Sequence, residues 1–227
     1  MGRPNRVLKA CALAIAVICV ACQTDPTGGH RPPALAASVP AFNGASRSAV
    51  RDDVSLSWHP GCPVSWSKLA VITVSYWGYD GQRHRGGLVV RDSAAGLLLT
   101  VFESLYRQRF QIERIHPVDV YGADDDRSMK ANNTSAFNCR TVASSGSVWS
   151  QHAYGLAVDI NPMQNPYIDG TTFDPPGGEH WSNRSDAVPG MAVEGGPLVG
   201  AFNAIGWGWG GHWRNTKDYQ HFSESGR

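Results

Sequence analysis

The chain has 227 residues, which suits one catalytic domain with short extensions. Its 42% hydrophobic and 17% charged residues exclude an intrinsically disordered chain. The formal net charge of +1 argues against nucleic-acid binding, which needs a clustered excess of Lys and Arg.

Residues 1–21 have the pattern of a secretory signal peptide. The basic residues Arg3, Arg6 and Lys9 precede an uncharged, mostly apolar run at 10–21, which is too short to span a bilayer. Cys22 follows a small residue at the end of this run. This pattern resembles a bacterial lipoprotein signal, in which the cysteine is lipidated after cleavage. An ordinary signal peptide is the alternative. Both predict an exported protein, either anchored in the cell envelope by its lipid alone or secreted.

The remaining cysteines, Cys62 and Cys139, lie in the body of the chain. Two cysteines in an exported domain most simply form one disulfide. A pair of zinc ligands is the weaker alternative, because neither cysteine belongs to a zinc-finger pattern.

The next segment, 22–55, is rich in Pro, Gly, Ala and Ser and has no helical or strand periodicity. It predicts a flexible or partly extended tether before a folded domain at 56–227. Within that domain, β-branched and aromatic residues at 69–77 predict a strand, and Asp80-Gly81 predicts a hairpin turn before a returning strand at 87–90.

Two helices are predicted after the hairpin. The first has Asp92 or Ser93 as its N-cap and an apolar stripe that should pack against a sheet. The stripe consists of Leu97, Leu98, Val101, Phe102, Leu105 and Tyr106. The second helix spans 197–205, with Pro197 near its start and Gly206 after its end. The pattern as a whole indicates a mixed α+β domain.

Chemistry-bearing residues gather in two short segments. In the first, the aliphatic residues of 156–160 alternate with Asp159, so a strand would direct Asp159 away from the core. A carboxylate there needs a partner, and Gly155 permits a turn that would return His152 to it. The second segment contains Asp218 and His221. Two imidazoles and one carboxylate are suitable zinc ligands, which would leave Asp218 as a general base.

Together these segments resemble a known family. The pattern Ser150-x-His152-x-x-Gly155-x-Ala157-x-Asp159, followed by Asp218-x-x-His221-Phe222, is similar to that of VanY-type D-alanyl-D-alanine carboxypeptidases. The family also includes L-alanyl-D-glutamate endopeptidases. The resemblance covers roughly 110–222 and implies a small α+β fold with a mainly antiparallel sheet flanked by helices, shared with hedgehog signalling domains.

The resemblance also implies roles for individual residues. His152, Asp159 and His221 would bind Zn²⁺, and Asp218 would be the catalytic acid and base. An arginine would hold the scissile carbonyl or the substrate carboxylate. Arg140 is the first candidate for this role, and Arg127 is the second. Ser223 stands where many relatives have Glu.

A glycine-rich aromatic segment at 206–213 precedes the second motif. Trp207 and Trp209 would line the substrate groove together with Ser150, or the tryptophans would instead fill the core.

We therefore expect a monomeric zinc peptidase that acts as a D-alanyl-D-alanine carboxypeptidase on peptidoglycan stem peptides. An L-alanyl-D-glutamate endopeptidase and a non-catalytic, zinc-bearing module that binds the cell wall are the alternatives.

Overall fold

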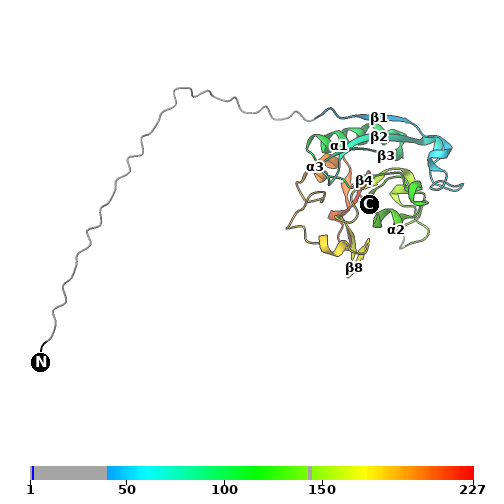
Figure 1. Cartoon of the computed structure of the whole chain (residues 1–227). Helices are drawn as coiled ribbons and strands as arrows, with labels where there is room; N and C mark the ends of the chain where they lie inside the picture. Colours follow the sequence, from blue (N-terminus) through cyan, green and yellow to red (C-terminus); the bar gives the residue numbers. More distant parts are fainter. Residues whose placement is uncertain (1, 3–39, 143–144) are drawn as a thin grey trace, which may run out of the picture. The chain divides into compact units, whose positions relative to one another are not determined.

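The computed structural model describes residues 2, 40–142 and 145–227 (Figure 1). The predicted signal peptide, Cys22 and most of the predicted tether lie outside the described residues. Within the described residues, no helix combines the length and the apolar character needed to cross a membrane. The α+β class with mainly antiparallel sheets is confirmed.

The largest sheet has the order β1-β2-β3 and is antiparallel. Its strands are β1 (Gly44–Ser48), β2 (Leu69–Trp77) and β3 (Arg83–Arg91). The predicted hairpin is confirmed, with Gly81 at φ 71° in the turn. The returning strand is longer than predicted because its first residues, which are exposed and polar, still pair with β2 in register.

Strand β1 corrects the predicted tether of 22–55 and the domain start at residue 56. The folded unit spans Val39–Arg227, and β1 adds an edge strand to β2. All five side chains of β1 are exposed, so the strand contributes main-chain hydrogen bonds and leaves no hydrophobic pattern in the sequence. The guanidinium of Arg47 then pairs with both oxygens of Asp53 at 2.7 Å, which holds the following turn to the strand.

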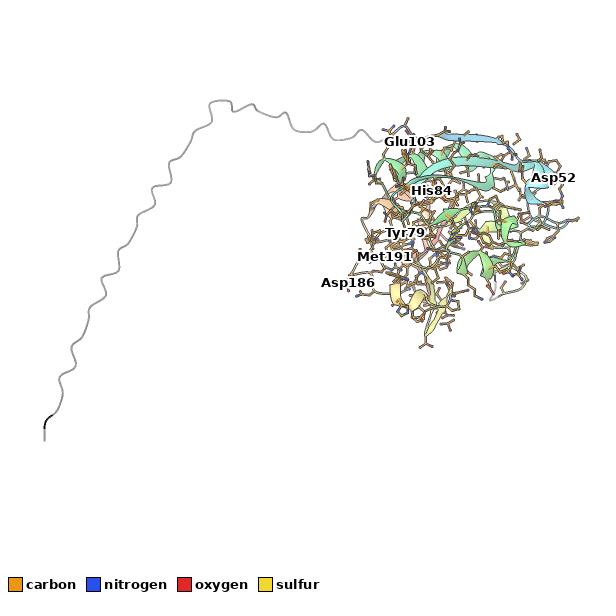
Figure 2. The ribbon with its side chains drawn as sticks, in the orientation of Figure 1. Asp52, Tyr79, His84, Glu103, Asp186 and Met191 are labelled. Carbon is orange, nitrogen blue, oxygen red and sulfur yellow. A yellow bond between two sulfur atoms is a disulfide. The ribbon has the colours of Figure 1, made fainter. Side chains whose placement is uncertain are left out.

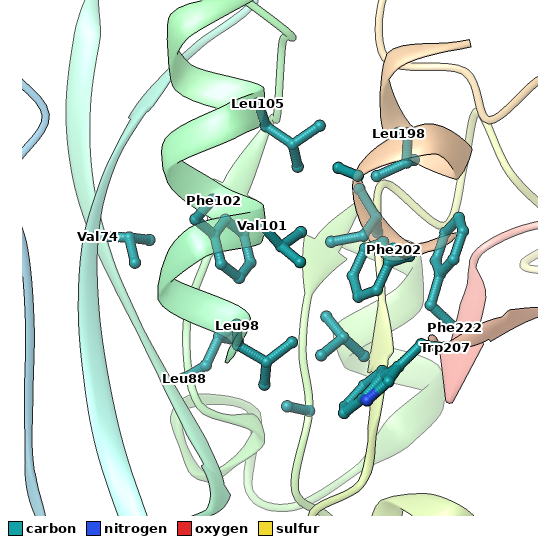
Figure 3. Packing of buried hydrophobic residues seen from close by; sticks show 14 of the residues in the cluster. Val74, Leu88, Leu98, Val101, Phe102, Leu105, Leu198, Phe202, Trp207 and Phe222 are labelled. Carbon is teal, nitrogen blue, oxygen red and sulfur yellow. The ribbon is translucent and has the colours of Figure 1, made fainter. Parts of the chain in front are cut away.

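Helix α1 (Ala95–Arg107) packs its apolar face between this sheet and α3 (Pro197–Asn203) (Figure 3). Both helices occur where predicted. Leu97 is 45% exposed, in contrast to the prediction, because the buried stripe follows i, i+3, i+4 spacing from Leu98. Asp92 and Ser93 lie in a 3₁₀ turn before α1, and neither caps the helix.

The remaining elements form the half of the unit that carries both motifs. Helix α2 spans Asp125–Lys130, and β4 (Arg114–Ile115) pairs with β5 (Asn133–Thr134) in parallel. The other strands form two antiparallel sheets, ordered β6-β11-β9 and β10-β7-β8. Their bounds are β6 Ala157–Asp159, β7 Tyr167–Asp169, β8 Thr172–Asp174, β9 Gly208–Trp209, β10 Lys217–Asp218 and β11 His221–Ser223.

Candidate metal centre

His152 is positioned by a 3₁₀ turn at Gln151–Tyr154. The Oγ of Ser150 caps this turn by accepting a hydrogen bond from the main-chain N–H of His152 at 3.3 Å. Gly155 ends the turn at φ 69°, and a Cβ there would lie 2.6 Å from the main-chain nitrogen of Arg91. Only glycine fits this conformation and this approach without strain. The turn therefore returns His152 to β6, as the sequence predicted.

The strand pair β6–β11 brings the two motifs together. Asp159 and His221 are opposite one another in its antiparallel register. His221 Nδ1 lies 3.1 Å from Asp159 Oδ1, and His152 Nε2 lies 3.1 Å from Asp159 Oδ2. The two imidazole nitrogens are 3.2 Å apart. All three side chains are at least nine-tenths buried.

These separations fit a divalent metal. Zinc–ligand bonds of about 2.0–2.1 Å in a tetrahedron place the ligand atoms roughly 3.3 Å apart. The three observed separations are within a few tenths of an ångström of that edge length. His152, Asp159 and His221 thus form a candidate metal site.

The tautomer of His152 is fixed by a main-chain oxygen. His152 Nδ1 lies 2.6 Å from the carbonyl oxygen of Ala136. A carbonyl can only accept a hydrogen bond, so Nδ1 carries a hydrogen, and Nε2, which faces the site, is the nitrogen that would bind a metal. Such partners of metal-binding histidines orient the ring and increase its basicity. No pattern in the sequence points to Ala136, because the contact uses a main-chain oxygen.

The charges of the site stabilise one another. Burial favours the neutral carboxyl, but the nearby imidazoles of His152 and His221 outweigh it and hold the pKa of Asp159 far below its usual range. Burial likewise disfavours a charged His152, yet the carboxylate of Asp159 holds the pKa of His152 above its ordinary value. The cluster is therefore preorganised around one negative charge.

Asp218 lies beside this cluster at the end of β10. Its Oδ1 is inaccessible to solvent and has no hydrogen-bond partner among the described residues. Burial raises the pKa of Asp218 to about 7, and the charge of nearby Asp159 acts in the same direction. A carboxyl group that can gain or lose a proton near neutral pH is suited to general acid–base chemistry.

The comparison with protein families covers the part of the unit that carries both motifs. Residues 143–224 match the family model for D-alanyl-D-alanine carboxypeptidase. The match contains His152, Asp159, Asp218 and His221, and it confirms the resemblance inferred from the two motifs. No curated protein and no solved structure matches the chain.

The two candidate arginines have different surroundings. Arg140 lies just before the matched segment, and its side chain is 32% exposed. It pairs with Asp125 at 2.7 Å, and its charge acts on Asp218 and His152. The side chain of Arg127 is 74% exposed and pairs with Asp124 on the surface. The structure thus brings Arg140, and not Arg127, to the site.

Three residues that were expected to line a substrate groove are buried instead. Trp207 and Trp209 are 3% and 5% exposed and belong to the hydrophobic core, where Trp209 stacks on Phe222. Fully packed indoles offer no face to a substrate, so the core-filling interpretation is correct. Ser150 is 5% exposed, and its hydroxyl caps the turn that carries His152.

Arg184 was not identified by sequence reasoning. It lies in the long connection before α3, where its guanidinium donates to Asn165 Oδ1 and the carbonyl of Gln164 and stacks on Tyr219 at 4.1 Å. Burial lowers the pKa of Arg184 to about 10. Tyr219 follows Asp218, so this contact ties the connection to the strand that carries the candidate base.

The same connection contacts the β2–β3 hairpin. Tyr79 donates a hydrogen bond to the carbonyl of Pro189 at 3.2 Å, and Tyr79 and Met191 lie near one another in Figure 2. A Cβ on Gly190 would collide with the Tyr79 hydroxyl. The connection is thus held from two sides, by the hairpin and by Arg184.

The predicted disulfide is present between Cys62 and Cys139. It uses both sulfur atoms, so the alternative of two zinc ligands is excluded, although His59 lies close to the pair. Cys139 directly precedes Arg140, so the bridge also anchors the segment that carries this arginine.

Proposed function

We propose that this protein is a zinc-dependent D-alanyl-D-alanine carboxypeptidase that trims peptidoglycan stem peptides. The observation that carries the proposal is the set of three buried ligand atoms at tetrahedral separations, with the carboxyl of Asp218 beside it. Its Oδ1 has no hydrogen-bond partner among the described residues. The family match over the same residues supports the proposal. A purely structural metal site would need no such carboxyl group.

Zinc held by His152, Asp159 and His221 would lower the pKa of a water molecule and polarise the scissile carbonyl. Asp218 takes the proton from the attacking water and delivers it to the leaving amine. Proton transfer by a positioned group contributes about 10²–10⁴-fold to the rate. Positive charge on the metal lowers the pKa of Asp218 from its metal-free value, which favours the basic form before attack.

Arg140 recognises the substrate. Its guanidinium pairs with Asp125 at 2.7 Å, and its side chain is 32% exposed. A guanidinium forms charge-assisted hydrogen bonds with carboxylates. Arg140 therefore offers a binding site for the terminal carboxylate of a stem peptide, and this favours a carboxypeptidase over an endopeptidase.

The disulfide supports the proposal that the protein is exported. A disulfide that closes a 77-residue segment forms and persists in oxidising compartments and is rare in reducing ones. The protein would act as a monomer in the cell envelope, anchored through Cys22 if that residue is lipidated. Its substrate, the peptidoglycan stem peptide, is found there.

Mass spectrometry of reaction products tests the specificity. The zinc-loaded protein, with its disulfide formed, is incubated with a muropeptide that carries a pentapeptide stem. We expect loss of one terminal alanine. Cleavage between L-alanine and D-glutamate would replace the carboxypeptidase with an endopeptidase. A folded, zinc-bound protein that cleaves neither bond would support a cell-wall-binding module instead.

A further inference from the structure

The four residues after β11 fold back onto the candidate metal site. The main-chain N–H of Gly226 donates to the carbonyl of Ser223 at 3.2 Å, and that of Arg227 donates to Ser225 Oγ at 3.3 Å. Gly226 has φ 72°, which is the left-handed region that favours glycine. We call Glu224–Arg227 the tail. Its turn returns the chain toward His221.

The tail is held in place by its neighbours, beginning with the N–H of Glu224, which donates to the carbonyl of Leu156 at 3.1 Å. The indole N–H of Trp213 donates to the carbonyl of Gly226 at 2.8 Å. The chain also passes directly over Gly208, where a Cβ would lie 2.5 Å from the Cα of Gly226. Trp213 and Gly208 both belong to the glycine-rich aromatic segment at 206–213. That segment therefore has a role beyond filling the core, which is to seat the tail.

The tail ends on the outer nitrogen of His221. The main-chain oxygen of Arg227 lies 3.1 Å from His221 Nε2, and Ser223 Oγ donates to the same oxygen at 2.9 Å. This oxygen can only accept a hydrogen bond, so it holds a hydrogen on Nε2. Nδ1, which faces His152 and Asp159, is then the nitrogen that would bind the metal. The arrangement mirrors the one at His152, where the carbonyl of Ala136 holds the outer nitrogen.

We propose that the tail is a positioning element for the metal centre, in which the main-chain oxygen of Arg227 accepts a hydrogen bond from Nε2 of His221 and orients its ring. This inference rests on the proposed metal site but not on its substrate. Ser223 holds the accepting oxygen in place through its hydroxyl. Because the contact uses the main chain, the side chain of residue 227 is immaterial, whereas the presence of the residue is essential.

Zinc affinity, measured by competition with a chromophoric chelator, tests the proposal on a matched pair. A chain ended after Ser225 lacks the accepting oxygen, whereas Arg227→Ala keeps it. Loss of such partners typically costs about 10–100-fold in metal affinity. We expect that loss for the shortened chain and an unchanged affinity for Arg227→Ala. Equal affinities of the shortened chain and the full chain would overturn the proposal.

Two further measurements separate the tail from general instability and from the proposed activity. ¹H–¹⁵N NMR of the zinc-loaded protein should show a slowly exchanging Nε2–H of His221 in the full chain and in Arg227→Ala, and a faster-exchanging one in the shortened chain. Ser223→Ala, which removes the hydroxyl that donates to the same oxygen, should speed exchange in the same direction. An unchanged exchange rate in both altered chains would contradict the tail's role, whether or not the full chain cleaves muropeptides.

Discussion

Arg140 and Arg127 differ in their surroundings, and this difference predicts that the same substitution lowers kcat/KM at Arg140 but not at Arg127. Arg140→Gln removes a half-buried guanidinium near Asp218. It should lower kcat/KM on a pentapeptide by roughly 10²-fold, because the substrate loses one hydrogen-bond donor to its scissile carbonyl or its terminal carboxylate. Arg127→Gln removes an exposed partner of Asp124 and should leave kcat/KM unchanged. Equal losses in steady-state kinetics would reject Arg140 as the substrate-binding arginine.

The raised pKa values of two site residues predict how the stability of the metal-free protein changes with pH. Burial raises the pKa of Asp218 to about 7, so its contribution to stability falls as pH rises from about 4 to about 7. Burial opposes charging of His152, but the carboxylate of Asp159 outweighs burial and raises the pKa of His152. The contribution of His152 to stability is therefore present below about pH 6.5 and is lost at higher pH. The depressed pKa of Asp159 leaves its contribution constant at neutral pH.

Urea unfolding of the metal-free protein should therefore give a larger free energy of unfolding at pH 5 than at pH 8. Asp218→Asn removes one of the two titrating groups and should reduce this difference. Added zinc should stabilise the protein most at pH 8, because metal binding requires deprotonated histidines. An equal pH dependence in the wild type and in Asp218→Asn would contradict the assigned environment of Asp218.

The turn that carries His152 depends on one glycine. Gly155→Ala places a Cβ 2.6 Å from the main-chain nitrogen of Arg91 and forces a non-glycine residue to φ 69°. Backbone strain of this kind costs about 1–3 kcal/mol. We expect a loss of that order in urea unfolding, together with weaker zinc binding, because the turn positions the ligand.

A second glycine provides the control for this prediction. Gly96 lies in α1, where a Cβ would meet no neighbour within 4 Å, and its φ is not in the left-handed region. Gly96→Ala should leave zinc binding unchanged and stabilise the helix by up to about 1 kcal/mol. If both alanine substitutions gave the same result, the special geometry of Gly155 would not matter.

Elements with a side-chain pattern were predictable from the sequence, and those that depend on the main chain were not. β2 and α1 have apolar periodicity, and the candidate ligands have a recognisable spacing. β1 is exposed on every residue, and the carbonyls of Ala136 and Arg227 act through oxygen atoms that every residue possesses. The tryptophans of 206–213 were ambiguous because a glycine-rich aromatic segment suits a groove wall and a core equally.

At the scale of the whole molecule, a disulfide cross-links the two halves of the folded unit. The Cys62–Cys139 bridge connects the start of the unit to the segment before the first motif and lies in a second hydrophobic cluster with Val54, Leu69 and Phe137. Replacing both cysteines with serine should lower the free energy of unfolding by about 2–4 kcal/mol. Urea unfolding with and without reductant measures this effect. The free energy of unfolding of the double variant should not change with reductant. That of the wild type should fall, on adding reductant, to about the value of the double variant.

The central claim is that three buried residues hold zinc and that Asp218 acts beside them as the base. Its most direct test compares zinc stoichiometry and turnover of a pentapeptide muropeptide in the wild type, Asp218→Asn and Asp52→Asn. Asp52 is an exposed aspartate at the far edge of the unit (Figure 2) and serves as the matched control. We predict one zinc per chain in all three proteins, with turnover lost only in Asp218→Asn. Turnover that survives in Asp218→Asn would contradict the account, as would a wild type that binds no zinc.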